Sequence, residues 1–231
     1  MQLYRGSGVD LSHDLASGAL LPQLSERFRL RYGWSPAPSE VHSWEKSLPY
    51  VAKVLLTAGL GDVELLVEYQ LTLTSKRADV VLVGSHPKGG VTAVIVENKQ
   101  RTAADIEDVD ERMVVVGNRH LLHPQQQVAN YVQYLSDFNQ LAHDGTLRVS
   151  GLAYLHNSSA SEIKSLKTPA LHDVARFPMF GVDDQGKLVS FLQHHLSGAG
   201  AGTPLCRGPR ETPGRPRRFS TVYRGRALTA R

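Results

Sequence analysis

The sequence has little of what several protein classes require. One of its 231 residues is cysteine, aromatic residues make up 7% of the chain, and long apolar runs are missing. Because Cys206 has no second cysteine to pair with, an internal disulfide is excluded, which is typical of a protein from a reducing compartment. The longest apolar runs, residues 80–83 and 93–96, are far shorter than the roughly 20 residues of a membrane-spanning helix. The first residues also lack the basic-then-apolar order of a secretory signal, so we expect a cytoplasmic protein without a membrane partner.

Sequence motifs of several common sites are missing as well. There is no Gly-x-Ser-x-Gly nucleophile motif, and the glycine-rich segment 198–203 lacks the Gly-Lys-Ser/Thr with which a P-loop binds phosphates. The acidic stretch 105–111 lacks the glycine and the spacing of a calcium-binding loop, so we expect a solvated connector there. Four histidines remain as candidate zinc ligands: His120, His123, His194 and His195. They have no cysteine or carboxylate partners at ligand spacing and are expected at the surface.

The charge is concentrated at one end of the chain. The net charge is +4, but residues 203–231 contain eight arginines and one acid, a net of +7, which leaves −3 for residues 1–202. The high isoelectric point therefore belongs to the C-terminal segment and does not indicate a basic body. Because residues 198–231 are rich in glycine, proline and arginine, we expect a disordered tail. A solvated terminus is the favoured interpretation, with a phosphate-binding arm as the alternative.

The rest of the sequence predicts an α/β domain. Apolar residues three and four apart predict helices over residues 20–32, 40–58, 123–141 and 188–196. Apolar alternation and short apolar runs predict strands over 63–71, 77–83, 91–99, 147–156 and 179–182. Ser39 is the expected N-cap of the second helix, Pro49 predicts a kink or interruption in it, and Gly59 is expected to end it. The predicted order is αβββαβ, with a helical extension over 1–38, a domain over 39–197 and the tail over 198–231.

Three charged residues are expected to meet on the second and third strands. Glu97 and Lys99 are two apart on one strand and therefore share a face. The turn at residues 84–90 folds the two strands into a hairpin that brings Asp79 opposite Glu97. Charges next to an apolar strand are unfavourable unless they pair or bind an ion, and converging carboxylates suit Mg²⁺ or Mn²⁺. A cross-strand salt bridge is the alternative interpretation.

In these positions the residues resemble the PD-(D/E)xK nuclease superfamily. Asp79 resembles the motif aspartate, Glu97 its acidic partner and Lys99 the motif lysine, while Ala78 stands where the proline is often found. The resemblance implies a restriction-endonuclease-like αβββαβ core with a central mixed sheet flanked by helices. It also implies that Asp79 and Glu97 hold Mg²⁺ (or Mn²⁺), with the Asn98 carbonyl completing the shell, and that Lys99 orients the attacking water.

Two further acids are candidates for the additional carboxylate that many members use near the metal. Glu40 lies on the first helix of the predicted core, in a stripe with Ser43 and Ser47 that is expected to face away from Trp44. A solvated carboxylate that interacts with the helix dipole is the alternative interpretation of Glu40. Glu68, at a polar-facing position of the first strand, is the rival for the same role.

The helix after the motif carries Gln127 and Tyr131, four residues apart. This spacing is similar to the Gln-x-x-x-Tyr of RecB-type and phage-exonuclease-type members, where the pair lies beside the active site. The resemblance implies that Gln127 and Tyr131 steady the lysine or a nearby phosphate. A helix with a polar face and a core tyrosine is the alternative interpretation.

A narrower resemblance covers residues 15 to 200. The residues that carry it are Ser39-Glu40, Ser43-Trp44, Ser47-Leu48, Glu68-Tyr69-Gln70, Arg77-Ala78-Asp79, Glu97-Asn98-Lys99-Gln100, His123-Pro124, Gln127, Tyr131 and Tyr154-Leu155-His156-Asn157. They resemble the N-terminal module of bacterial Schlafen-group-like DNA/RNA helicases, in which a P-loop motor follows. Since no P-loop follows here, we expect a stand-alone module or, preferably, a truncated or frameshifted helicase, with a helicase or ATPase as a candidate partner.

The sequence therefore predicts a metal-dependent nuclease that hydrolyses DNA, with RNA as the alternative substrate. The competing hypothesis is a non-catalytic module, derived from a truncated helicase, that binds nucleic acid or another protein.

Overall fold

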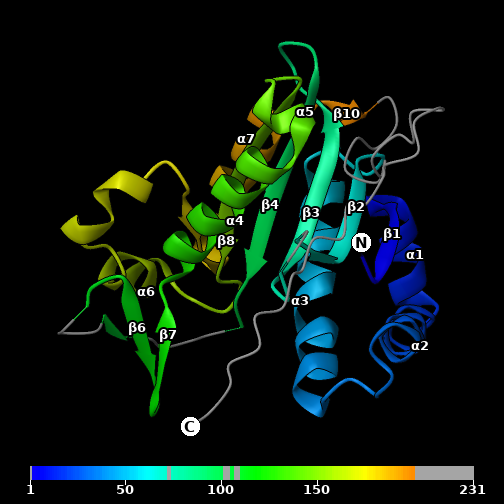
Figure 1. Cartoon of the computed structure of the whole chain (residues 1–231), viewed down its shortest axis with the longest axis horizontal. Coiled ribbons are helices and arrows are strands. Elements are labelled where there is room, and N and C mark those ends of the chain that lie inside the picture. Colours follow the sequence, from blue (N-terminus) through cyan, green and yellow to red (C-terminus); the bar gives the residue numbers. More distant parts are fainter. Residues whose placement is uncertain (1, 72–73, 101–104, 107–109, 201–231) are drawn as a thin grey trace, which may run out of the picture.

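The computed structural model describes residues 2–71, 74–100, 105–106 and 110–200. Within these residues the chain forms an α/β fold with a central mixed sheet of seven strands and helices on both faces (Figure 1). The strands of the sheet are β1 (Tyr4–Ser7), β2 (Glu64–Gln70), β3 (Arg77–Ser85), β4 (Val91–Asn98), β8 (Leu147–Tyr154), β9 (Met179–Phe180) and β10 (Gly198–Ala199). The order is β1-β2-β3-β4-β8-β9, and β10 pairs with the end of β3. The first four strands are antiparallel, whereas β4, β8 and β9 run parallel.

Two apolar cores enclose the sheet, one on each face. The first face is covered by α1 (Gly8–Ala16), α2 (Leu20–Tyr32), α3 (Pro38–Thr57) and α7 (Gln185–His195). The second face is covered by α4 (Pro124–Phe138) and α5 (Gln140–His143), with α6 (Ala160–Ser165) and the 3₁₀ helix η1 (Pro169–Val174) beside them. Strand alternation divides the side chains between these cores: Val94 and Val96 of β4 face α3, and Ile95 faces α4. A second 3₁₀ helix, η2 (Val182–Asp184), precedes α7.

The predicted α/β class is confirmed, and α3, β2, β3, β4, α4 and β8 follow one another in the predicted order. The start of α3 differs from the prediction, because Ala37 is the N-cap and Pro38 is the first helical residue. Glu40 Oε2 accepts a hydrogen bond from Ala37 N at 3.1 Å, so a carboxylate replaces the expected Ser39 cap. Of the kink or interruption predicted at Pro49, the interruption is wrong, since α3 continues through this residue, and the kink stays a prediction. Gly59, with φ +70°, follows the end of α3 as expected.

Several short elements were not predicted. The extension over residues 1–38 also contains the edge strand β1. Leu11 and Leu24, from the two helices of the extension, are buried in the same core as α3. A three-stranded sheet is formed by β5 (Asp105–Ile106), β6 (Met113–Val116) and β7 (Arg119–Leu122), of which β5 lies in the stretch 105–111 where a connector was expected. Residues 107–109 of the acidic stretch, and residues 201–231 of the expected tail, lie outside the described residues.

The prediction that His123 lies at the surface is wrong. His123 is fully buried and is the N-cap of α4, where its Nδ1 accepts a hydrogen bond from Gln125 N at 3.2 Å. Its Nε2 lies 3.0 Å from the Leu166 carbonyl oxygen, which satisfies the second ring nitrogen. His195 is half-buried, whereas His120 and His194 are exposed.

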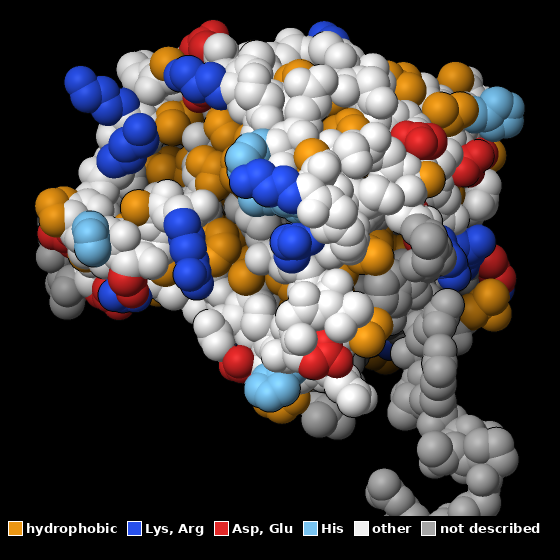
Figure 2. Space-filling view, turned by 90° about the horizontal axis from the view of Figure 1, so that it is seen from above, with side chains coloured by type: hydrophobic (Ala, Val, Ile, Leu, Met, Phe, Trp, Pro, Cys, Tyr) orange, Lys and Arg blue, Asp and Glu red, His pale blue; other side chains and the backbone are white. Residues whose placement is uncertain are grey.

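The β3–β4 turn and the candidate site residues lie at opposite ends of the sheet. Seen from above, at the end that carries the β3–β4 turn, Lys and Arg side chains are interspersed with acidic and apolar ones (Figure 2). The candidate site residues lie at the other end of these strands, where β3 begins and β4 ends. In the part of the chain that the structure describes, no helix is long and apolar enough to cross a membrane.

Candidate active site

Three carboxylates form a row across β2, β3 and β4. Val80 pairs with Val96, so one further step of the same register places Asp79 opposite Glu97. On the other side of β3, the pairs formed by Val67 and by Tyr69 flank Glu68 and place it opposite Asp79. Neighbouring strands are about 4.8 Å apart, so the three acids belong to one local site. The structure thus brings Asp79 and Glu97 together as the hairpin predicts.

Glu97 is the most deeply buried member of this row, with 1% of its surface exposed. Its Oε1 accepts a hydrogen bond from Gln127 Nε2 at 2.6 Å and also pairs with Lys99 Nζ. Its Oε2 is buried and has no hydrogen-bond partner among the described residues. Burial, together with the charge of Asp79, raises the pKa of Glu97 to about 8, although Lys99 opposes the shift.

Asp79 is half-buried, and its Oδ2 accepts a hydrogen bond from the backbone N of Asn98 at 2.8 Å. This bond fixes the Asp79 carboxylate next to the end of β4. Burial raises the pKa of Asp79, while the charge of Lys99 and the Asn98 N–H lower it. Two neighbouring carboxylates with raised pKa values favour either a shared proton or a bound cation.

Gln127 and Tyr131 reach this row from α4. Gln127 Nε2 donates hydrogen bonds both to Glu97 Oε1 and, at 3.0 Å, to the Tyr131 hydroxyl oxygen. The ring of Tyr131 packs in the α4 core, and burial followed by the charge of Glu97 raises the pKa of its hydroxyl. Tyr131 is therefore a core residue whose hydroxyl contacts the site residue Gln127. Gln127 therefore contacts the Glu97 carboxylate directly, and that carboxylate in turn pairs with Lys99.

Glu68 has an unusual backbone conformation that changes the direction of β2. Its φ is +53°, in the left-handed region, which costs about 1 kcal/mol for a residue with a side chain. Val67 before it packs in the α3 core, but Tyr69 and Leu71 after it pack in the α4 core. The prediction of one continuous alternation over 63–71 is therefore wrong at this point. The reversal turns Glu68 toward α3.

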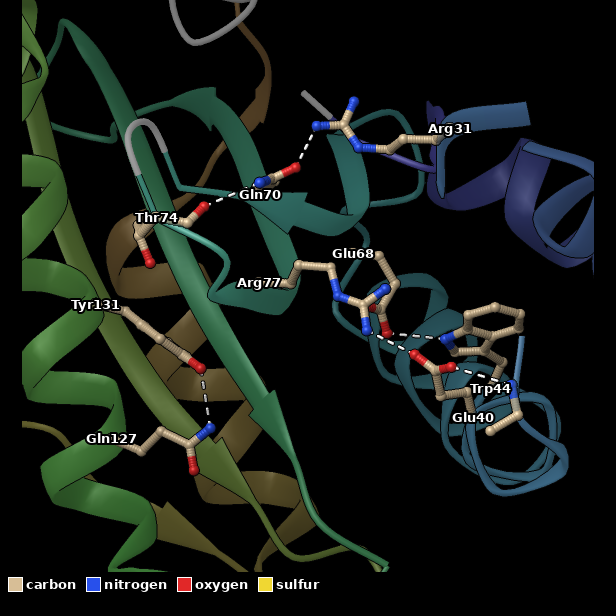
Figure 3. A network of polar contacts seen from close by, with 10 residues as sticks. Arg31, Glu40, Trp44, Glu68, Gln70, Thr74, Arg77, Gln127 and Tyr131 are labelled. Atoms are coloured by element: carbon tan, nitrogen blue, oxygen red, sulfur yellow. Dashed lines mark hydrogen bonds and ion pairs between the residues drawn. The ribbon is translucent and has the colours of Figure 1, made fainter. Parts of the chain in front are cut away.

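An arginine and a tryptophan hold Glu68 in place (Figure 3). Trp44 Nε1 of α3 donates a hydrogen bond to Glu68 Oε1 at 2.8 Å, and Arg77 Nε lies 3.2 Å from Glu68 Oε2. Burial and the charge of Asp79 raise the pKa of Glu68 to about 7, against the opposing effect of Arg77. The same guanidinium donates from Nη2 to Glu40 Oε1 at 2.6 Å, so Arg77 bridges two acids.

Glu40 does not face away from Trp44, contrary to the prediction. Residues 40, 43 and 44 are three and four apart and share one face of α3, and all three line a cavity of about 360 Å³. Ser47, expected on the same stripe, is buried instead. The lining residues of the cavity are Ser39, Glu40, Ser43, Trp44, Glu68, Ser75, Arg77 and Asp79. Both rival acids, Glu40 and Glu68, therefore lie at the same hollow as Asp79.

Two carboxylates of the site, those of Asp79 and Glu97, fit a divalent cation. In the described ranges, no group of three or more His, Cys, Asp or Glu side chains is arranged to hold a metal ion. The reason is visible in the contacts, because Glu68 is turned toward Arg77 and Trp44. Asp79 and Glu97 remain, and the unpartnered Oε2 of Glu97 supplies a free oxygen. Mg²⁺ is commonly bound by one or two carboxylates and keeps several waters, so this donor set suits it.

Two residues in these contacts received no role in the sequence analysis, namely Trp44 and Arg77. The available signal was their spacing, because Trp44 follows Glu40 by one helical turn and Arg77 precedes Asp79 by two positions on a strand. Their pairing with Glu68 depends on the reversal of β2, which spacing alone does not predict.

No protein-family model, no curated protein and no solved structure matches this chain.

Proposed function

We propose that this protein is a metal-dependent nuclease with a restriction-endonuclease-like core of the PD-(D/E)xK type. The observation that carries the proposal is the state of Glu97, which is buried, lies opposite Asp79 and has an Oε2 without a partner in the part of the chain that the structure describes. A buried carboxylate oxygen without a hydrogen bond is unfavourable, and coordination of a cation would satisfy it. The order α3-β2-β3-β4-α4-β8 supports the proposal, since Asp79 and Glu97 fall on the second and third strands of that core.

Asp79 and Glu97 would hold Mg²⁺ or Mn²⁺, and the Asn98 carbonyl is the candidate third ligand. When bound, such an ion polarises a phosphate and lowers the pKa of a water. The other steps of the proposed reaction are carried out by side chains of the protein. Lys99, paired with Glu97 and 16% exposed, orients the attacking water and offsets charge that develops on the phosphate.

Gln127 and Tyr131 act as positioning residues in this proposal. The Gln127 amide donates to Glu97 Oε1 and to Tyr131, which fixes the rotation of the carboxylate and leaves Oε2 for the cation. Glu40 and Glu68 are held by Arg77, so we assign them to the rim of the site. The proposed substrate is DNA, with RNA as the alternative, and the proposed partner is a helicase or ATPase of the Schlafen-group-like kind.

One observation favours a second candidate, a non-catalytic module that binds nucleic acid or another protein. Lys99 pairs with Glu97 and Arg77 pairs with Glu68, so two of the three acids already have cationic partners. In this case the row would serve as an ion-pair network that stabilises the end of the sheet.

A cleavage assay separates the two candidates. Plasmid DNA, single-stranded DNA and RNA are incubated with the full chain in Mg²⁺, in Mn²⁺ and in a chelator. We expect cleavage only with metal, and a loss of at least about a hundredfold in Asp79→Asn, Glu97→Gln and Lys99→Met, because the first two remove a ligand of the cation and the third removes the group that orients the water. Glu45→Gln, an exposed acid of α3, is the matched control.

Cleavage in the chelator, or cleavage that survives Glu97→Gln and Lys99→Met, would contradict the nuclease proposal. Binding of nucleic acid without cleavage of any substrate would favour the non-catalytic module.

A further inference from the structure

A chain of aromatic rings leads from the cavity to the surface. Trp44, which lines the cavity, has its ring centroid 6.2 Å from that of Phe28. Phe28 lies 4.6 Å from Tyr32, and Tyr32 lies 5.7 Å from Trp34. Trp44 is 3% exposed, whereas Trp34 is 64% exposed. The chain of rings therefore ends in an indole that is open to solvent.

Two guanidinium groups are associated with these rings. Arg77 Cζ lies 5.4 Å from the Phe28 centroid and 5.5 Å from the Tyr32 centroid, within the range of cation–π contacts. Arg31 Cζ lies 5.5 Å from the Tyr32 centroid. Because Arg77 also lines the cavity, Tyr32 touches the wall of the site and Trp34 is one ring further out.

The position of Trp34 follows from the link between α2 and α3. Gly33, with φ +82°, ends α2 in a left-handed turn, and α3 begins at Pro38. The first turn of α3 carries Ser39 and Glu40, both of which line the cavity. Trp34 thus lies in the short segment that leads directly to the wall of the site.

We infer that Tyr32 and Trp34 form a stacking platform for the bases of a single-stranded nucleic acid. The inference rests on the proposed function and specifies its substrate. Bases of a single strand can lie on an exposed aromatic ring, whereas bases of a duplex are covered by their neighbours. The acids of the site repel a phosphate backbone. Stacking of bases on the rings therefore supplies affinity for a nucleic acid that the charges at this cavity do not supply. Arg31, which is hydrogen-bonded to Gln70, adds positive charge beside the Tyr32 ring.

Binding is measured in a chelator, so that cleavage cannot interfere. The full chain is titrated with a fluorescently labelled single-stranded oligothymidine, and the anisotropy gives the Kd. We expect Trp34→Ala to raise the Kd about tenfold, and Trp34→Phe to retain most of the affinity, because one stacked base is lost in the first variant only. Phe138→Ala is the matched control, since Phe138 is 59% exposed and lies about 16 Å from Gln127 along α4.

A second readout uses the tryptophans themselves. The chain contains two tryptophans, and the exposed one is Trp34. Stacking on a base quenches indole emission, so oligothymidine should quench the intact protein and leave Trp34→Ala, which retains the buried Trp44, nearly unquenched.

Equal affinities of Trp34→Ala and the intact protein, or an equal loss for duplex and single-stranded DNA, would overturn the inference. So would a failure of the intact protein to bind any single strand. Binding through Trp34 without metal-dependent cleavage would contradict the proposed function and leave the stacking platform supported. Metal-dependent cleavage with unchanged Kd in Trp34→Ala would support the function and remove the platform.

Discussion

At the residue scale, the deciding feature is a carboxylate whose surroundings disfavour its charge. Glu97 is buried and adjoins a second acid, yet among the described residues its donors are one charged group, Lys99, and one amide, Gln127. Burying an ionised group is expensive unless every lone pair is satisfied, and one oxygen of Glu97 is not. The site is therefore destabilising by itself, which is typical of residues retained for function rather than stability.

This imbalance predicts how stability depends on pH in the metal-free protein. The pKa of Glu97 is raised from its ordinary 4.5 to about 8, so between these values the unfolded chain loses a proton that the folded chain keeps. The part of the stability that depends on Glu97 is therefore fully present below about pH 4.5 and is lost as the pH rises toward about 8. We expect the free energy of unfolding of Glu97→Gln, relative to that of the intact protein, to be on the order of 2 kcal/mol higher at pH 8.5 than at pH 6.

Urea unfolding in a chelator at both pH values measures this difference. Glu45→Gln, at an exposed position of α3, retains Glu97 and should therefore differ from the intact protein by the same amount at both pH values. Glu68, with a pKa raised to about 7, remains in Glu97→Gln, so part of the decline with pH should persist. A difference between Glu97→Gln and the intact protein that stays constant from pH 6 to 8.5 would show that Glu97 is not the titrating group.

At the element scale, the distance between α4 and the sheet decides whether Gln127 reaches Glu97. Gly151 of β8 lies under α4, and a Cβ at that position would meet Val128 Cγ1 at 2.5 Å and the Ile95 carbonyl oxygen at 3.2 Å. The absent side chain therefore permits the close approach of the helix. Val128 is the neighbour of Gln127, so the packing of one residue positions the other.

Gly151→Ala should consequently destabilise the protein by about 2 kcal/mol, because overpacking moves α4 or β8. Gly186→Ala in α7 is the matched control, since a Cβ there meets nothing within 4 Å and a helical alanine is favourable. Urea unfolding of the two variants measures the effect. Equal stability of Gly151→Ala and the intact protein would mean that α4 and β8 can move apart to admit the methyl group without a loss of stability.

The elements that could be predicted are those with long, regular periodicity. Helix α3 and strand β4 owe their signals to apolar residues that repeat over many positions, and the β3–β4 hairpin placed Asp79 opposite Glu97. The direction of Glu68 could not be predicted, because it depends on a left-handed φ at a glutamate and on contacts with Trp44 and Arg77 of other elements, neither of which has a signal in the apolar pattern. Short strands such as β1 and β5 have too few residues to show a period.

At the scale of the whole molecule, the N-terminal segment belongs to the same core as the candidate site. Strand β1 pairs along β2, the strand that carries Glu68, and so covers the edge of the sheet. Leu11 of α1 and Leu24 of α2 are fully buried against the core that also contains Leu55 of α3. The helical extension predicted from the sequence is therefore also a cover for the sheet, and β2 would have a free edge without it.

Deletion of residues 1–18 should accordingly abolish cooperative unfolding and cause aggregation, because it removes β1 and α1 and exposes both an unpaired strand and an apolar core. The measurement is circular dichroism during heating, together with light scattering. Val9→Ser is the control, because it changes a side chain of α1 that is 55% exposed and leaves the buried side chains of α1 in place. It should unfold like the intact protein. A soluble deletion variant with an unchanged Tm would show that residues from 19 onward fold without β1 and α1, and that β2 tolerates an open edge beside Glu68.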